Sequence, residues 1–130
     1  MRAAALDLVV AHAREAAPDE CCGLLLGRGG GIAEAVRARN AADEPGTRFL
    51  IDPHDHFAAI RMARGRGLDV IGFYHSHPRS AAEPSARDRA EFSYPDHFYL
   101  IVSLSVEAAG IGLFRFDAGN FQRVSFVTVA

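Results

Sequence analysis

Two histidines and an aspartate fall within the stretch "HSHPRSAAEPSARD", residues 75–88. Successive side chains of a strand point to opposite faces, so His75 and His77 share one face, about 6–7 Å apart along an expected strand. Asp88 follows at the start of an expected helix. Two neutral nitrogens and one carboxylate, with a fourth position left for water, form the open ligand set of a catalytic zinc site. The stretch therefore predicts a catalytic Zn²⁺ site.

Each part of this stretch also has an ordinary structural interpretation. Ser85 and Asp88, behind Pro84, form a helix N-terminus signature, with Ser85 as the cap and Asp88 in the first turn. His75 and His77 would then be a half-exposed pair at the end of a strand. The helix cap and the histidine pair at a strand end are independent explanations, and neither predicts the other. Both would have to occur by coincidence in one short stretch, so the metal-site interpretation is favoured.

A second histidine pair, His54 and His56 in "DPHDHF", lies where an aspartate would cap a helix. Imidazoles two residues apart on a helix diverge, because only side chains three or four residues apart are neighbours. The pair is therefore interpreted as a solvated helix start. His12 and His97 are expected to be isolated surface or boundary residues.

The elements around the stretch are expected to form one α/β domain over residues 1–130. A strand over residues 68–77 carries the histidines, and Pro78 ends it. Helices are expected before Pro18, after Pro53 with one apolar side, and after Pro84. That apolar side would contain Phe57, Ile60 and Met62. Further strands are expected over residues 22–28, 32–42, 47–52, 98–105, 110–117 and 121–129. The last strands follow one another too closely for helical crossovers, which predicts a mixed β-sheet flanked by about three helices.

Composition excludes several classes of function. The net charge is −2, which leaves no basic footprint for nucleic acid or an anionic membrane. All 14 basic residues are arginine, so a P-loop lysine and Schiff-base catalysis are excluded. Cys21 and Cys22 are adjacent and cannot close a disulfide loop. Charged residues interrupt the N-terminal apolar patch, so neither a signal peptide nor a membrane span is expected, and the free thiols indicate a reducing cytoplasm.

The stretch resembles the JAMM (MPN-plus) metalloprotease motif: His-x-His, seven residues, Ser, two residues, Asp. This family also places a glutamate just before a "GLLLG"-like strand, and Glu20 holds that place in "DECCGLLLG". The segments "RFLIDP" and "YLIVSL" look like the family as well. The resemblance implies a JAB/MPN fold, similar to that of cytidine deaminases, and a zinc-dependent isopeptidase or peptidase.

The resemblance also assigns roles residue by residue. His75, His77 and Asp88 match the zinc ligands, Glu20 matches the residue that holds the attacking water and accepts its proton, and Ser85 matches the residue that steadies the tetrahedral intermediate. Two residues after Glu20 on a strand, Cys22 would face the site, and Cys21 would face away. Buried, small apolar side chains remain the default interpretation of both cysteines.

The compact chain resembles the stand-alone prokaryotic members of the family, some of which act on ubiquitin-fold sulfur-carrier proteins or their conjugates. The expected reaction is hydrolysis of the amide bond after a C-terminal Gly-Gly, releasing cysteine, another amino acid or a lysine side chain. Two alternatives stay open: a non-catalytic zinc-containing MPN scaffold, and a zinc amidohydrolase acting on a small molecule. The sequence leaves the oligomeric state open, with a homodimer as one option.

Overall fold

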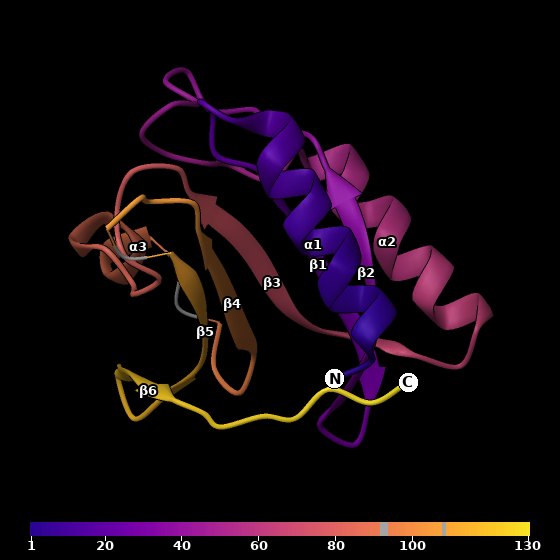
Figure 1. Ribbon diagram of the computed structural model, residues 1–130. Helices are drawn as coiled ribbons and strands as arrows, with labels where there is room; N and C mark the ends of the chain where they lie inside the picture. The colour runs from indigo at the N-terminus through magenta and orange to yellow at the C-terminus, as the bar shows by residue number, and fades with distance from the viewer. Residues whose placement is uncertain (92–93, 108) are drawn as a thin grey trace.

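A six-stranded mixed sheet forms the centre of the structure, a computed structural model that describes residues 1–91, 94–107 and 109–130 (Figure 1). The strands are β1 (Cys22–Arg28), β2 (Gly31–Ala38), β3 (Asp69–His77), β4 (Phe98–Ser103), β5 (Gly110–Asp117) and β6 (Asn120–Arg123). They lie in the order β2-β1-β3-β4-β5-β6. Strands β3 and β4 pair in parallel and their neighbours pair antiparallel. The predicted mixed α/β sheet is confirmed.

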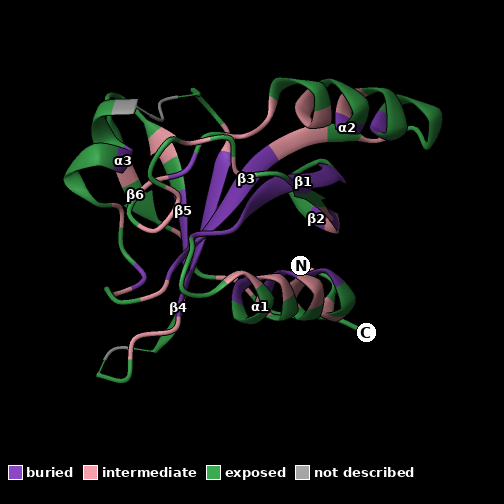
Figure 2. Ribbon diagram, turned by 90° about the horizontal axis from the view of Figure 1, so that it is seen from above, coloured by how far each residue is buried: buried purple, intermediate pink, exposed green. Residues whose placement is uncertain are grey.

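Helices cover both faces of this sheet (Figure 2). Helix α1 (Ala3–Ala16) lies on one face, and α2 (Pro53–Gly65) and α3 (Ala86–Glu91) lie on the other. Val9 of α1 packs in one apolar cluster with Leu25 and Tyr74. Ala59 of α2 packs in a second cluster, on the opposite face, with Phe73. In the described part of the chain, no helix is long and apolar enough to cross a membrane.

Strand β1 shows why this sequence makes a central strand. Its "CGLLLG" residues are buried on both faces, because β2 and β3 flank the strand and helices cover it above and below. The glycine run after it turns the chain into β2, with Gly29 and Gly30 at φ values of 60° and 82° that residues with a Cβ rarely adopt. The predicted hairpin is therefore confirmed.

Two expected strands are wrong in part. Residues 47–52 form no strand; Ile51 makes an isolated β-bridge with Asn40. Phe49, within this segment, is buried in the core instead. The strand expected over 121–129 ends at Arg123, and the tail beyond it makes one bridge, between Val129 and Arg2. In both segments contacts with distant parts of the chain replace the ladder that local β-propensity favours.

The expected apolar side of α2 is also wrong. Phe57 is 63% exposed and Met62 is 39% exposed, whereas Ala59 and Ala63 are buried. Small side chains on the buried side let the helix axis approach the sheet closely, and the larger side chains then remain outside. Size at the contact, rather than hydrophobicity alone, sets the orientation of this helix.

The close packing around Gly23 yields a first prediction. A Cβ at this position would lie 2.2 Å from the ring of Tyr74 and 2.3 Å from the carbonyl oxygen of Val36. Gly23→Ala should therefore lower the free energy of unfolding by about 1–3 kcal/mol, because the central strands must separate to admit the methyl group. Urea unfolding followed by circular dichroism measures this loss.

Gly65→Ala is the matched control, since no atom lies within 4 Å of a Cβ there. This change should leave stability unaltered or raise it by up to about 1 kcal/mol. Equal unfolding midpoints for the two variants would contradict the packing described for Gly23.

Candidate active site

The carboxyl end of β3 places both predicted histidines on one face of the sheet. His75 lies opposite Cys22 of the antiparallel strand β1, and both His75 and His77 are buried. Ser76 points to the opposite face, where its hydroxyl oxygen accepts a hydrogen bond from the Cys21 amide at 2.8 Å. The alternation expected from the sequence therefore holds up to the last residue of the strand.

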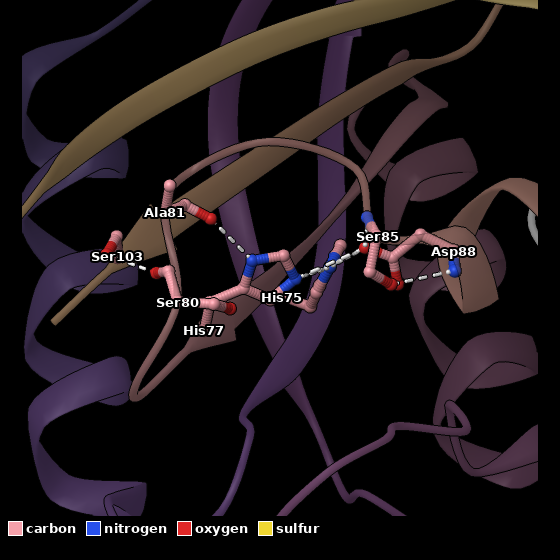
Figure 3. Close-up of polar contacts among 7 residues, drawn as sticks. All are labelled: His75, His77, Ser80, Ala81, Ser85, Asp88 and Ser103. Atoms are coloured by element: carbon pink, nitrogen blue, oxygen red, sulfur yellow. Dashed lines mark hydrogen bonds and ion pairs between the residues drawn. The ribbon is translucent and has the colours of Figure 1, made fainter. Parts of the chain in front are cut away.

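The donor atoms of His75, His77 and Asp88 converge on one point (Figure 3). The two Nε2 atoms lie 3.1 Å apart, and Asp88 Oδ2 lies 3.1 Å from His75 Nε2 and 3.2 Å from His77 Nε2. Ligand atoms of a tetrahedral zinc ion, each about 2.0–2.1 Å from the metal, lie roughly 3.3 Å from one another. The arrangement and the chemistry of this donor set thus fit the zinc ligands predicted from the sequence.

A main-chain contact fixes the orientation of the His77 ring. Its Nδ1–H donates to the carbonyl oxygen of Ala81 at 2.7 Å (Figure 3). The proton on Nδ1 leaves Nε2 with a lone pair directed at the site, as a metal ligand requires. The loop that supplies Ala81 is tied to β4, because the hydroxyl of Ser103 donates to the Ser80 carbonyl at 2.5 Å and the Leu104 amide donates to the main-chain carbonyl of His77 at 3.0 Å.

Asp88 reaches the site from the first turn of α3. Its amide donates to Ser85 Oγ at 3.0 Å, and its Oδ2 accepts from the Ser85 amide at 2.9 Å. This is a reciprocal helix cap, which confirms the structural interpretation of Ser85 and Asp88 and is compatible with Asp88 as a metal ligand. Burial raises the pKa of Asp88, but the adjacent imidazoles of His75 and His77 outweigh burial and hold the pKa below its usual value.

An aromatic ring packs on His75. Phe49 stacks on the imidazole with ring centroids 4.3 Å apart and an angle of 24° between the rings. Burial lowers the pKa of His75, although Asp88 acts in the opposite direction. A neutral imidazole held between a ring and the sheet suits a metal ligand. Phe49 was not identified from the sequence, where it appeared only as part of an expected strand.

Glu20 lies just before β1 and is 8% exposed. Burial raises its pKa to about 7, and Asp88 adds to this, whereas His77 lowers it. The Glu20 amide donates to the Pro45 carbonyl at 2.8 Å, and the Glu20 carbonyl accepts from Asn40 Nδ2 at 3.0 Å. A carboxyl with a pKa near neutrality is suited to accept a proton and release it again.

The cysteines lie on opposite faces of β1. Cys22 packs in the same cluster as Phe49, on the side of His75, and Cys21 packs with Tyr74 on the other side. Burial raises the pKa of Cys21 to about 11 and that of Cys22 to about 12. Both thiols are therefore protonated near neutral pH, which agrees with their interpretation as small buried side chains.

The remaining histidines lie outside this cluster. His54 is exposed at the start of α2, which Asp52 caps by accepting from the His54 amide at 2.9 Å. His56 is half-buried and packs edge-on against Phe73. His12 Nδ1 lies 2.7 Å from the Tyr74 hydroxyl. Within the described residues, the group suited to a metal is His75, His77 and Asp88.

Comparison with known proteins identifies the family. Residues 2–117 match the family model for prokaryotic homologues of the JAB domain. The chain is 38% identical over 109 residues to a desampylase of Haloferax volcanii, covering 79% of this chain and 78% of that protein. It is 32% identical over 104 residues to a CysO-cysteine peptidase of Mycobacterium bovis, covering 79% and 71%.

The fold agrees with this assignment. A solved JAB1/MPN domain protein from Archaeoglobus fulgidus superposes with a TM-score of 0.62 over 96% of this chain and 90% of that one, at 22% identity. Because the identity is low, this likeness concerns the fold alone. The match over residues 2–117 shows that the chain belongs to the prokaryotic homologues of the JAB domain.

Proposed function

We propose that this protein is a zinc-dependent isopeptidase or peptidase that hydrolyses the amide bond after the C-terminal Gly-Gly of a ubiquitin-like or sulfur-carrier protein. The observation that carries the proposal is the convergence of three buried donor atoms, 3.1–3.2 Å apart, from His75, His77 and Asp88. The names of two relatives, a desampylase and a CysO-cysteine peptidase, support a conjugate of this kind as the substrate. The free thiols of Cys21 and Cys22 suit a cytoplasmic setting.

His75, His77 and Asp88 are proposed to hold the zinc. Zinc supplies a Lewis acid that activates water and polarises the scissile carbonyl. Glu20 accepts the proton from the attacking water and passes it to the leaving amine, a role that its pKa of about 7 suits. Ser85 Oγ accepts from the Asp88 amide, which leaves the hydroxyl proton to be donated to the oxyanion.

The proposed specificity for a C-terminal Gly-Gly follows from the absence of side chains on glycine. Two glycines without side chains let the tail of a carrier lie close to buried donor atoms, where bulkier residues would be excluded. The globular body of the carrier would bind outside the site and provide affinity, while the extended tail presents its terminal carbonyl. The leaving amine, from cysteine or from a lysine side chain, would be recognised less strictly.

Removing a ligand should remove the metal. His77→Ala should lose most of the one equivalent of zinc that the wild-type protein is expected to bind, because two donor atoms hold the ion far more weakly than three. Elemental analysis of the purified protein measures the zinc content. His54→Ala is the control, since His54 is exposed and lies outside the cluster. Full zinc occupancy in His77→Ala would exclude this ligand set.

Removing the carboxylate of Glu20 should lower the rate of hydrolysis without disturbing the metal site or the fold. Glu20→Gln should keep its zinc and its thermal stability while kcat falls by about 10³-fold, because the glutamine cannot accept a proton. Ser85→Ala should lower kcat less, by about 10²-fold, and cost about 1 kcal/mol of stability through the lost cap. Turnover of Glu20→Gln at the wild-type rate would contradict the mechanism. A wild-type protein with full zinc and no turnover on any conjugate would instead favour a scaffold.

The Gly-Gly requirement can be measured on the substrate. Changing the penultimate glycine of a sulfur-carrier adduct to valine should lower kcat/KM at least about tenfold more than replacing the leaving cysteine by another amine. Mass spectrometry of the released carrier and amine gives both rates. Efficient cleavage of unstructured peptides that lack Gly-Gly would indicate a general peptidase.

A further inference from the structure

The side chain of Asn40 connects the segment that carries Glu20 with the loop that carries Phe49. Its Nδ2 donates to the carbonyl oxygens of Glu20 and Arg48, each at 3.0 Å. Its Oδ1 accepts from the amides of Ala42 and Leu50, each at 3.0 Å. An asparagine side chain offers two N–H donors and two acceptor lone pairs. Each of these four is used by the main chain in this structure.

The four contacts fix a loop that has no regular structure of its own. Residues 41–50 contain neither helix nor strand. The Asn40 side chain holds the main chain on both sides of Phe49, through Arg48 and Leu50. Phe49 in turn stacks on His75, which belongs to the proposed metal centre. One half-buried side chain, together with the packing of Phe49 in the core, therefore places this ring.

The same side chain restrains Glu20. Glu20 is tied through its carbonyl to Asn40 and through its amide to Pro45, and Pro45 belongs to the loop that Asn40 organises. Glu20 lies two residues before the first residue of β1, so the hydrogen-bond ladder of β1 does not hold its main chain. A reacting group displaced by about 1 Å can lose about 10²-fold in rate. The loop and Asn40 thus provide the fixed geometry that Glu20 needs.

We propose that Asn40 is a positioning residue for hydrolysis, which holds the main chain of Glu20 and the loop that places Phe49 on His75. This inference rests on the proposed role of Glu20 as the base. Asn40 reaches the reaction only through these neighbours and is assigned no contact with substrate or metal. Replacing it should therefore affect the rate of the chemical step more than the binding of the carrier.

Asn40→Asp tests this with almost no change in side-chain size. The variant places an oxygen opposite the carbonyl oxygens of Glu20 and Arg48, which turns two hydrogen bonds into repulsions. We expect kcat on a sulfur-carrier adduct to fall by about 10–100-fold, with KM within about twofold and one equivalent of zinc retained. Asn120→Asp, the same chemical change at the exposed first residue of β6, is the matched control and should alter none of these values.

Hydrogen exchange gives a reading that does not depend on activity. In Asn40→Asp, peptides that contain Glu20 and residues 41–50 should exchange their amide protons at least about tenfold faster than in wild type, while β4 keeps its protection. Asn40→Ser, which cannot make all four contacts, replaces the aspartate variant should the latter fail to fold.

The outcomes separate the two proposals. A wild-type protein that cleaves no conjugate would contradict the proposed function, and hydrogen exchange would still test the positioning role. Unchanged exchange around Glu20 in the Asn40 variants would overturn the positioning role whatever the activity. An unchanged kcat per folded, zinc-loaded molecule, with only a lower melting temperature, would also overturn it, because that result describes a purely structural residue.

Discussion

The structure depends on the meeting of three buried polar side chains at the end of β3. His75, His77 and Asp88 point their donor atoms at one another, and each is almost wholly removed from water. Burying such groups is costly unless each finds a partner, and here the two imidazoles share one carboxylate oxygen, Asp88 Oδ2, at 3.1 and 3.2 Å. A divalent cation at their common focus would satisfy all three donors, which makes this arrangement suited to a metal and poorly suited to a purely structural role.

The sheet order explains how this focus is built. Strand β1 brings Glu20 to one side of β3, because Cys22 pairs with His75 in the antiparallel register. Strand β4, parallel to β3 on its other side, anchors the loop between His77 and α3 through Ser103. Parallel strands cannot be joined by a tight turn, so β3 and β4 need a longer crossover connection. The short helix α3, which carries Asp88, lies in that connection. Backbone contacts on both flanks therefore restrict the ligands before any ion binds.

Much of this was predictable because it follows local rules. Period-two alternation put His75 and His77 on one face, and the Ser85-x-x-Asp88 spacing marked the start of α3. The features that the sequence missed depend on contacts between distant segments. Phe49 leaves an expected strand because it packs on His75, and Asn40 shows no local pattern that reveals its four main-chain partners. Asn40 lies inside the strand expected over residues 32–42, whereas the observed strand β2 ends at Ala38.

X-ray absorption at the zinc edge of the purified protein tests most directly whether the end of β3 forms a zinc centre. Zinc held by His75, His77 and Asp88 should show nitrogen and oxygen neighbours at about 2.0–2.1 Å, with the more distant scattering of two imidazoles and no sulfur. A sulfur shell at about 2.3 Å would place the metal at Cys21 or Cys22 and contradict the account. Protein that takes up no zinc under the same conditions would contradict it as well.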